Sequence, residues 1–131
     1  MKKKDLKPAG VFKYFEEICQ VPRPSKKEEK MIAYLKAFGA KHNLETKVDE
    51  AGNVLIKKPA TPGKENLQTV VLQSHIDMVC EKNNDVQHDF LTDPIETEID
   101  GEWLKAKGTT LGADNGIGVA TELAILADDS I

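Results

Sequence analysis

Two short segments of the chain hold side chains that could bind a metal ion. His75 and Asp77 stand two residues apart at the end of an apolar run. Alternate residues of a strand point to the same side, so these two side chains can converge while Ile76 faces the core. A neutral imidazole is a good zinc ligand, and a metal-bound histidine usually gives its other ring nitrogen to a carboxylate. The spacing therefore favours His75 as a ligand and Asp77 as the carboxylate that orients its ring.

Asp114 lies in a glycine-rich segment, residues 108–118, that leads into a helical pattern. Its two carboxylate oxygens could bridge two metals, and metals about 3.5–4 Å apart can polarise a carbonyl and generate hydroxide near neutral pH. Neither segment is specific by itself. His75 could simply be hydrogen-bonded to a nearby aspartate at a strand end. The glycines could serve a tight loop, a close helix–sheet contact or a phosphate cradle.

The composition is that of an ordinary folded domain. Of 131 residues, 40% are apolar and 31% charged, and the net charge is −4. Such a chain has one domain by length, enough apolar surface for a core, and no basic footprint for nucleic acid. No apolar run approaches the roughly 20 residues of a membrane span. Cys19 and Cys80 fit no zinc-finger or CxxC spacing, so we expect two reduced thiols in a cytoplasmic protein.

Helices and strands are predicted around the two segments. Apolar residues at helical spacing predict helices over residues 8–21, 26–42 and 115–127, the second opened by a capping box at residues 25–28. Alternating or continuous apolar residues predict strands over residues 44–49, 54–56 and 69–72 and a hairpin over 95–106 with a type I′ turn at Asp100-Gly101. The strand at 69–72, buried on both faces, would deliver His75 and Asp77. This order predicts an α/β fold, a mixed sheet with flanking helices.

Five further side chains are given structural roles. We expect His42 to be solvent-exposed, His88 to anchor its loop by a hydrogen bond, and Trp103 to pack beside the hairpin turn. Cys80 is interpreted as a small buried hydrophobe rather than a site residue. Ser74 lacks the Gly-x-Ser-x-Gly context of a nucleophile, which disfavours a serine hydrolase.

Several blocks occur together in a fixed order: His75-Ile76-Asp77-Met78-Val79, His88-Asp89-Phe90, Asp93-Pro94-Ile95, Asp100-Gly101-Glu102-Trp103 and residues 108–118. With them the chain resembles the N-terminal part of the cytosolic Xaa-His dipeptidase family, also called aminoacyl-histidine dipeptidase or peptidase D. That family belongs to the di-zinc aminopeptidase, carboxypeptidase and aminoacylase superfamily. The resemblance extends over nearly the whole chain.

The resemblance implies a role for each candidate residue. His75 would be a ligand of one zinc, Asp77 the carboxylate that clamps its imidazole, and Asp114 the ligand bridging two zinc ions, with manganese or cobalt as alternatives. Family members often have a cis peptide directly after the bridging aspartate, here Asp114-Asn115. The implied reaction is hydrolysis of dipeptide substrates, with neither a nucleic acid nor a membrane as partner.

Other parts of such a site have no counterpart in residues 1–131. The family's general base and three more ligands follow the bridging aspartate, and neither Glu122 nor Asp128-Asp129 fits their pattern. We therefore expect a partial metal-binding catalytic domain that lacks the lid or dimerisation domain and the C-terminal part of the catalytic domain. It should bind little or no zinc and be inactive alone. The full-length protein is expected to be a homodimer, and this fragment to self-associate through uncovered surfaces.

Other functions stay open at this stage. The full-length protein could be another hydrolase of the superfamily, a tripeptidase, aminoacylase or carboxypeptidase, because substrate choice depends on residues outside the chain. A truncated, non-catalytic binding protein is a different class. A nucleotide-phosphate loop at residues 112–118 fits neither G-x-G-x-x-G nor the P-loop ending. The sequence fixes neither the preferred dipeptide nor whether Ile131 is a natural end.

Overall fold

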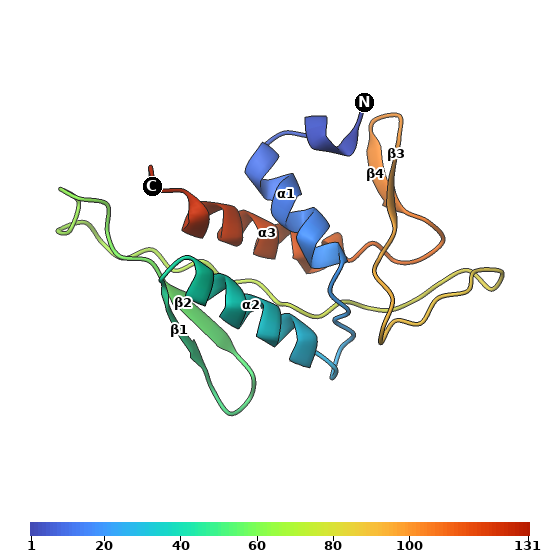
Figure 1. The fold of residues 1–131 in the computed structure, drawn as a ribbon, viewed down its shortest axis with the longest axis horizontal. Helices are drawn as coiled ribbons and strands as arrows, with labels where there is room; N and C mark the ends of the chain where they lie inside the picture. The colour runs from blue at the N-terminus through green and yellow to red at the C-terminus, as the bar shows by residue number, and fades with distance from the viewer.

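The computed structural model describes residues 1–131 and confirms the α/β class (Figure 1). The helices are α1 (Ala9–Cys19), α2 (Glu29–Lys41) and α3 (Ala113–Ala127), with a short 3-10 helix η1 at Lys3–Asp5. The strands are β1 (Glu45–Val48), β2 (Val54–Lys57), β3 (Thr97–Asp100) and β4 (Trp103–Ala106). They form two separate antiparallel pairs, β1 with β2 and β3 with β4. None of the helices combines the length and hydropathy that crossing a membrane would require.

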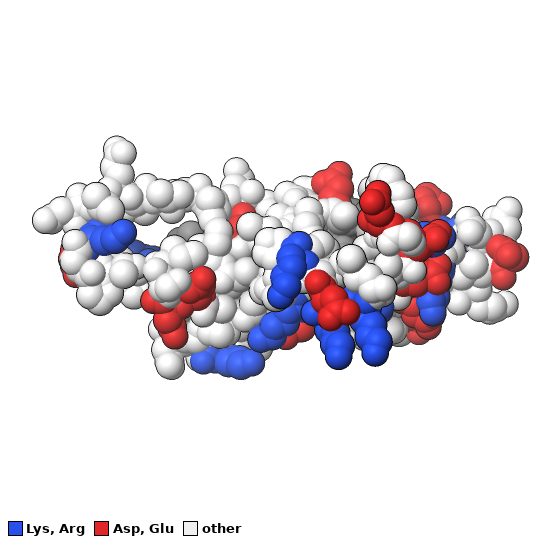
Figure 2. Space-filling view, turned by 90° about the horizontal axis from the view of Figure 1, so that it is seen from above, with Lys and Arg blue, Asp and Glu red and all other residues white.

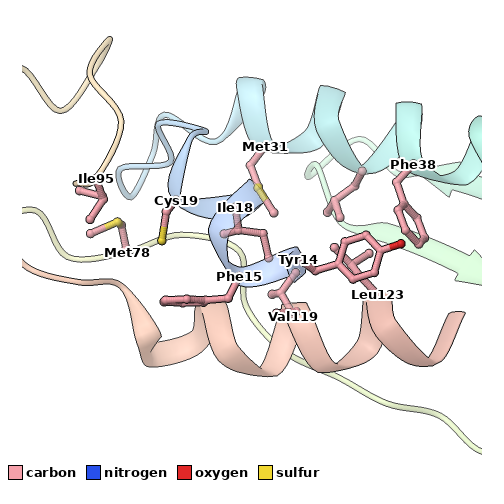
Figure 3. Close-up of a cluster of buried hydrophobic side chains, with 12 residues drawn as sticks. Tyr14, Phe15, Ile18, Cys19, Met31, Phe38, Met78, Ile95, Val119 and Leu123 are labelled. Atoms are coloured by element: carbon pink, nitrogen blue, oxygen red, sulfur yellow. The ribbon is translucent and has the colours of Figure 1, made fainter. Parts of the chain in front are cut away.

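The core is built on α1, which lies between α2 and α3 (Figure 3). Phe15 and Ile18 of α1 are almost fully buried, as are Met31 of α2 and Leu123 of α3. Residues three or four apart share one face of a helix, so the apolar spacing seen in the sequence becomes one buried stripe on each helix. This packing fixes α3, whose first turn contains Asp114, against α1.

The β1–β2 hairpin lies beside α2 and follows the sequence closely. Its strands pair from Glu45 with Lys57 to Val48 with Val54, around the turn that was predicted at residues 51–53. In the second hairpin, Asp100 pairs with Trp103, so the turn residues are Gly101 and Glu102.

Two predictions for the β3–β4 hairpin were wrong. Gly101 has a φ of +61° and Glu102 has no positive φ. That is the pattern of a type II′ turn, with glycine at its first central position, and not of a type I′ turn at Asp100-Gly101. Trp103 is 76% exposed instead of packed beside the turn. The β3–β4 ribbon has only two strands, and no other element covers the Trp103 side chain.

The predicted buried strand at residues 69–72 was also wrong. These residues are extended but make no backbone–backbone hydrogen bond and belong to no strand. Val70 and Val71 are 78% and 81% exposed. A strand requires a neighbour for its backbone groups, and no other segment of the chain runs alongside this one as a ladder partner. The segment belongs to the extended connection that runs from β2 to the β3–β4 hairpin (Figure 1), and its apolar side chains are left exposed.

The capping box predicted at residues 25–28 does not form. Helix α2 begins at Glu29 and has no side-chain cap, and Lys26 adopts a left-handed conformation with φ of 72°. The Ser25 hydroxyl donates instead to the Asp77 carboxylate. The hydroxyl therefore donates to a distant carboxylate, instead of accepting from a local backbone N–H as a capping box requires.

Two histidine predictions fail because aromatic rings cover the imidazoles. His42 is only partly exposed, and its ring lies 4.4 Å from that of Phe38. His88 makes no hydrogen bond, and its ring lies 4.4 Å from that of Phe90. In both residues Nε2 is buried without a partner. Cys80 is half-buried beside the core, and both cysteines are free thiols.

Acidic and basic side chains are interspersed on the face shown in Figure 2. Most of the charged groups that pair do so within one hairpin or turn, such as Lys105 with Asp100 at 2.7 Å. Exposed pairs of this kind contribute little to stability. The charge pattern is therefore that of a solvated surface around the helical core.

Candidate functional site

The site forms where the extended segment at residues 73–77 passes the first turn of α3. His75 and Asp114 are 39 residues apart in sequence, yet His75 Nε2 lies 2.9 Å from Asp114 Oδ1. Helix α3 is irregular here: Asp114 and Asn115 have non-helical backbone angles, and the peptide bond between them is cis. The structure thus has the cis bond that was expected after Asp114. The Asp114 side chain is 96% exposed, so its carboxylate faces solvent beside the imidazole.

Asp77 holds the other side of the His75 ring. His75 Nδ1 lies 3.0 Å from Asp77 Oδ1, and because an ionised carboxylate can only accept, Nδ1 is the donor. The second oxygen of Asp77 accepts from the Ser25 hydroxyl. Both carboxylate oxygens are therefore engaged, and the ring is fixed with Nε2 directed at Asp114.

These contacts set the protonation behaviour of the site. The hydrogen bond to Asp114 is the main cause that raises the pKa of His75; desolvation partly opposes it, and the hydrogen bond to Asp77 adds a smaller increase. The Ser25 hydroxyl, followed by His75, lowers the pKa of the Asp77 carboxyl. Asp77 is thus an anion at neutral pH, as a carboxylate that orients a ligand should be.

Arg23 links the two segments of the site, the one that contains His75 and Asp77 and the one that leads into α3. Its guanidinium is buried at 2% exposure and donates to backbone carbonyls of both the 76–77 segment and Gly112. Burial lowers the pKa of Arg23, but an arginine stays protonated in a protein. The backbone N–H of Met78 in turn donates to the carbonyl of Arg23 at 3.0 Å.

His75 and Asp114 fit part of a metal site. Imidazole nitrogen and carboxylate oxygen are both zinc donors, and a tetrahedral ion with bonds of about 2.0–2.1 Å holds two ligands about 3.3 Å apart. The separation of 2.9 Å is close to that value. No set of three His, Cys, Asp or Glu side chains in the chain is arranged to hold a metal. The pair fits two positions of a coordination sphere and leaves the others to further ligands.

The three predicted site residues lie together, while the other candidates do not join them. Glu122, on α3, accepts a hydrogen bond from Ser74 Oγ at 2.7 Å. A hollow of about 490 Å³ lies beside the β3–β4 hairpin and is lined mainly by polar residues such as Glu81, Lys105 and Thr110. Neither His75 nor Asp114 lines it, so it is separate from the site.

Sequence analysis missed Arg23 and Ser25. Arg23 stands between two prolines and was given no role, and Ser25 was assigned to a helix cap. A long charged side chain between Pro22 and Pro24 is no local signal for burial. Their partners are about 50 to 90 residues away along the chain, as the contact from Ser25 to Asp77 shows.

Comparison with known proteins gives close relatives but no matching family model. The sequence is 52% identical over 126 residues to the cytosol non-specific dipeptidase of Escherichia coli (strain K12), covering 96% of this chain and 26% of that protein. The structure matches an aminoacylhistidine dipeptidase from Vibrio alginolyticus with a TM-score of 0.96 and 53% identity, over 100% of this chain and 27% of that one. The chain therefore spans about a quarter of the length of these relatives.

A more distant likeness concerns the fold alone. A tripeptidase from Staphylococcus aureus matches with a TM-score of 0.71 at 21% identity, over 89% of this chain and 31% of that one. The arrangement of helices and hairpins is therefore shared more widely than the sequence.

Proposed function

We propose, from the premise that this chain has the sequence and fold of the N-terminal part of the aminoacyl-histidine dipeptidases, that it provides two ligands of a di-zinc centre. The complete centre would hydrolyse dipeptides. The observation that supports this most directly is the convergence of Asp77, His75 and Asp114 in a single row of hydrogen bonds. Such a row combines a ligand, its orienting carboxylate and a second, exposed ligand.

Each residue has a distinct task in this proposal. His75 would hold one zinc, while Asp77 retains the proton on Nδ1 and prevents rotation of the ring. The exposed carboxylate of Asp114 would be the ligand common to both ions. The bound zinc pair would supply Lewis acidity and an activated water for peptide hydrolysis. Ser25 keeps the Asp77 carboxylate directed at His75.

The 131-residue chain is proposed to be inactive alone. A catalytic zinc usually needs three protein ligands, and this chain offers two residues that converge. Glu122 is engaged by Ser74, so it is not proposed as the general base. The missing ligands and the base would come from residues outside this chain. We further propose that the complete protein is cytosolic, in line with the name of its Escherichia coli relative and the free thiols, and that it is a homodimer.

The substrate range is proposed to be dipeptides, either Xaa-His or a broader set. The two close relatives have names that differ on this point, one non-specific and one aminoacylhistidine. A panel of dipeptides with and without C-terminal histidine would distinguish the two ranges. Hydrolysis of tripeptides but not dipeptides would contradict the proposal.

The proposal is tested by extending the sequence of the source gene beyond the codon for Ile131 and expressing the longer frame. We expect the longer protein to contain about two zinc ions per chain and to hydrolyse dipeptides, since a two-metal site is proposed. His75→Gln and Asp114→Asn should each remove activity and zinc. Glu102→Gln, an exposed turn residue, is the matched control and should change neither. His75-dependent hydrolysis by the 131-residue chain alone would contradict its proposed inactivity.

A further inference from the structure

Arg23 contacts both segments of the site through separate nitrogens. Nη1 lies 3.3 Å from the carbonyl oxygen of Ile76 and 3.4 Å from that of Asp77. Nη2 lies 2.8 Å from the carbonyl oxygen of Gly112. One acceptor is thus next to His75 and another lies two residues before Asp114. The guanidinium spans the gap between the two ligand-bearing segments.

The surroundings of the guanidinium leave it little freedom. A Cβ added at Gly112 or at Gly116 would come within 2.6 Å of Nη2. The missing side chains of these two glycines are what allow α3 to approach Arg23 this closely. Since the guanidinium is fully buried and forms no ion pair, it must keep its carbonyl acceptors to offset the cost of desolvation. A change in this group should therefore move both segments.

Arginine has the geometry for this task and lysine does not. Its planar guanidinium presents several N–H donors on separate nitrogens in a rigid fork, whereas the donors of lysine radiate from one nitrogen. A lysine at position 23 would have to reach the Ile76 and Gly112 carbonyls from one nitrogen, so we expect it to hold the two segments less firmly. The charge would be kept and the bridge weakened.

We infer that Arg23 is a positioning residue that sets the separation of His75 and Asp114 by holding the backbone carbonyls beside each of them. The inference rests on the proposed function only for what His75 and Asp114 bind. The positioning itself is a property of the polypeptide and is measurable without metal.

The test is a double-mutant comparison by NMR on the ¹⁵N-labelled 131-residue chain in EDTA at one fixed pH. The chain has three histidines, and His75→Gln identifies the His75 ring signals in long-range ¹H–¹⁵N spectra. The measured quantity is the change in the His75 Nε2 chemical shift caused by Asp114→Asn. It is recorded in four backgrounds: wild type, Arg23→Met, Arg23→Lys and Met31→Ala. Met31→Ala is the control, because Met31 is fully buried but lies in α2, which includes neither segment of the site.

We expect a clear change in the wild type, its loss in Arg23→Met and a reduced change in Arg23→Lys. Met31→Ala should keep the full change although it also lowers stability. If Arg23→Met does not fold, Arg23→Lys and Gly112→Ala decide, since an alanine at 112 displaces the guanidinium while keeping its charge. If Asp114→Asn changes the His75 Nε2 shift in both of these variants as much as in the wild type, the inference is overturned. It is also overturned if Met31→Ala loses the shift change as fully as Arg23→Met does, or if the wild type shows no shift change.

A second measurement separates this inference from the proposed function. Zinc content of the longer protein, with and without His75→Gln, reports whether His75 is a ligand. Arg23→Lys should weaken zinc binding there without removing it. Zinc content that is independent of His75 would contradict the metal role and leave the NMR result on positioning intact.

Discussion

Replacing Val70 and Val71 by lysine is expected to weaken self-association of the chain. Both side chains are about four-fifths exposed and lie in an extended segment whose backbone groups have no ladder partner. Leu67 and Leu72 extend the same apolar stretch. An uncovered extended segment of this kind can pair with a second copy through its backbone and its side chains. The double substitution leaves the buried core untouched.

The size of the effect follows from the exposed area. Full burial of a valine side chain is worth about 1.5–3 kcal/mol, and about four-fifths of that is available at each position. If an interface covers half of the exposed part, the two valines contribute roughly 1.2–2.4 kcal/mol together. That corresponds to a dissociation constant about 10- to 50-fold larger in the variant. Repulsion between the added lysines would increase the difference.

Sedimentation equilibrium over a concentration series measures this constant directly. Leu91→Lys is the control, because Leu91 is also an exposed aliphatic residue, at 53%, but lies in the loop before β3. We expect it to leave the dissociation constant unchanged. A wild-type chain that stays monomeric at every concentration would refute the reasoning. Equal weakening by Leu91→Lys would show that general surface hydrophobicity, and not this segment, drives association.

Three further changes test the core and the site. Burial raises the pKa of the Cys19 thiol to about 12, so iodoacetamide at about pH 8 should modify Cys80 first, as mass spectrometry of the native chain can show. Asp114→Asn should lower the pKa of His75 in an NMR titration of the metal-free chain, because Asp114 is the main cause of its increase. A raised histidine pKa stabilises the fold below the ordinary value of 6.5, and this stabilisation is lost as pH rises through the raised value. The free energy of unfolding of Asp114→Asn should therefore depend less on pH over this range than that of the wild type. Phe15→Ala should lower the free energy of unfolding by about 3–5 kcal/mol in urea denaturation, because it empties a site between α1 and α3.

Each of these outcomes has its own control. Cys80→Ser should abolish rapid labelling, and labelling of Cys19 at the same rate would contradict its burial. Glu122→Gln should leave the His75 titration unchanged, whereas an unchanged titration in Asp114→Asn would contradict the contact. Phe12→Ala, on the same helix but outside the buried cluster, should cost much less than the Phe15 change.

Local patterns in the sequence predicted most of the regular structure. The apolar spacing of Phe15 and Ile18 recurs as the buried stripe of α1, and the alternating segment after Leu44 forms β1, although Val48 at its end is 39% exposed. These features depend on neighbours three to five residues away, so a single sequence contains the information. The i, i+2 spacing of His75 and Asp77 likewise placed the two side chains within hydrogen-bonding distance.

Patterns whose outcome depends on a distant partner were interpreted wrongly. The continuous apolar run at residues 69–72 predicts burial, but burial requires a surface to cover it, and no segment of this chain does so. Ser25 has the sequence pattern of a helix cap, yet its hydroxyl donates a hydrogen bond to Asp77, 52 residues away. Local propensity gives way where a charged acceptor lies nearby in space, because such hydrogen bonds are stronger than neutral ones.

By itself the sequence determined the helices, the first hairpin and the types of side chain that could bind metal. Only the tertiary structure decided that Asp114 meets His75 and that Arg23 links their segments. These contacts span 39 to 89 residues of chain, and no periodicity or local motif encodes such a closure. They arise because burying the stripes of α1 and α3 together brings the start of α3 against the 73–77 segment. The hydrophobic core thus brings together two segments whose site residues it does not contain, and Arg23 links them.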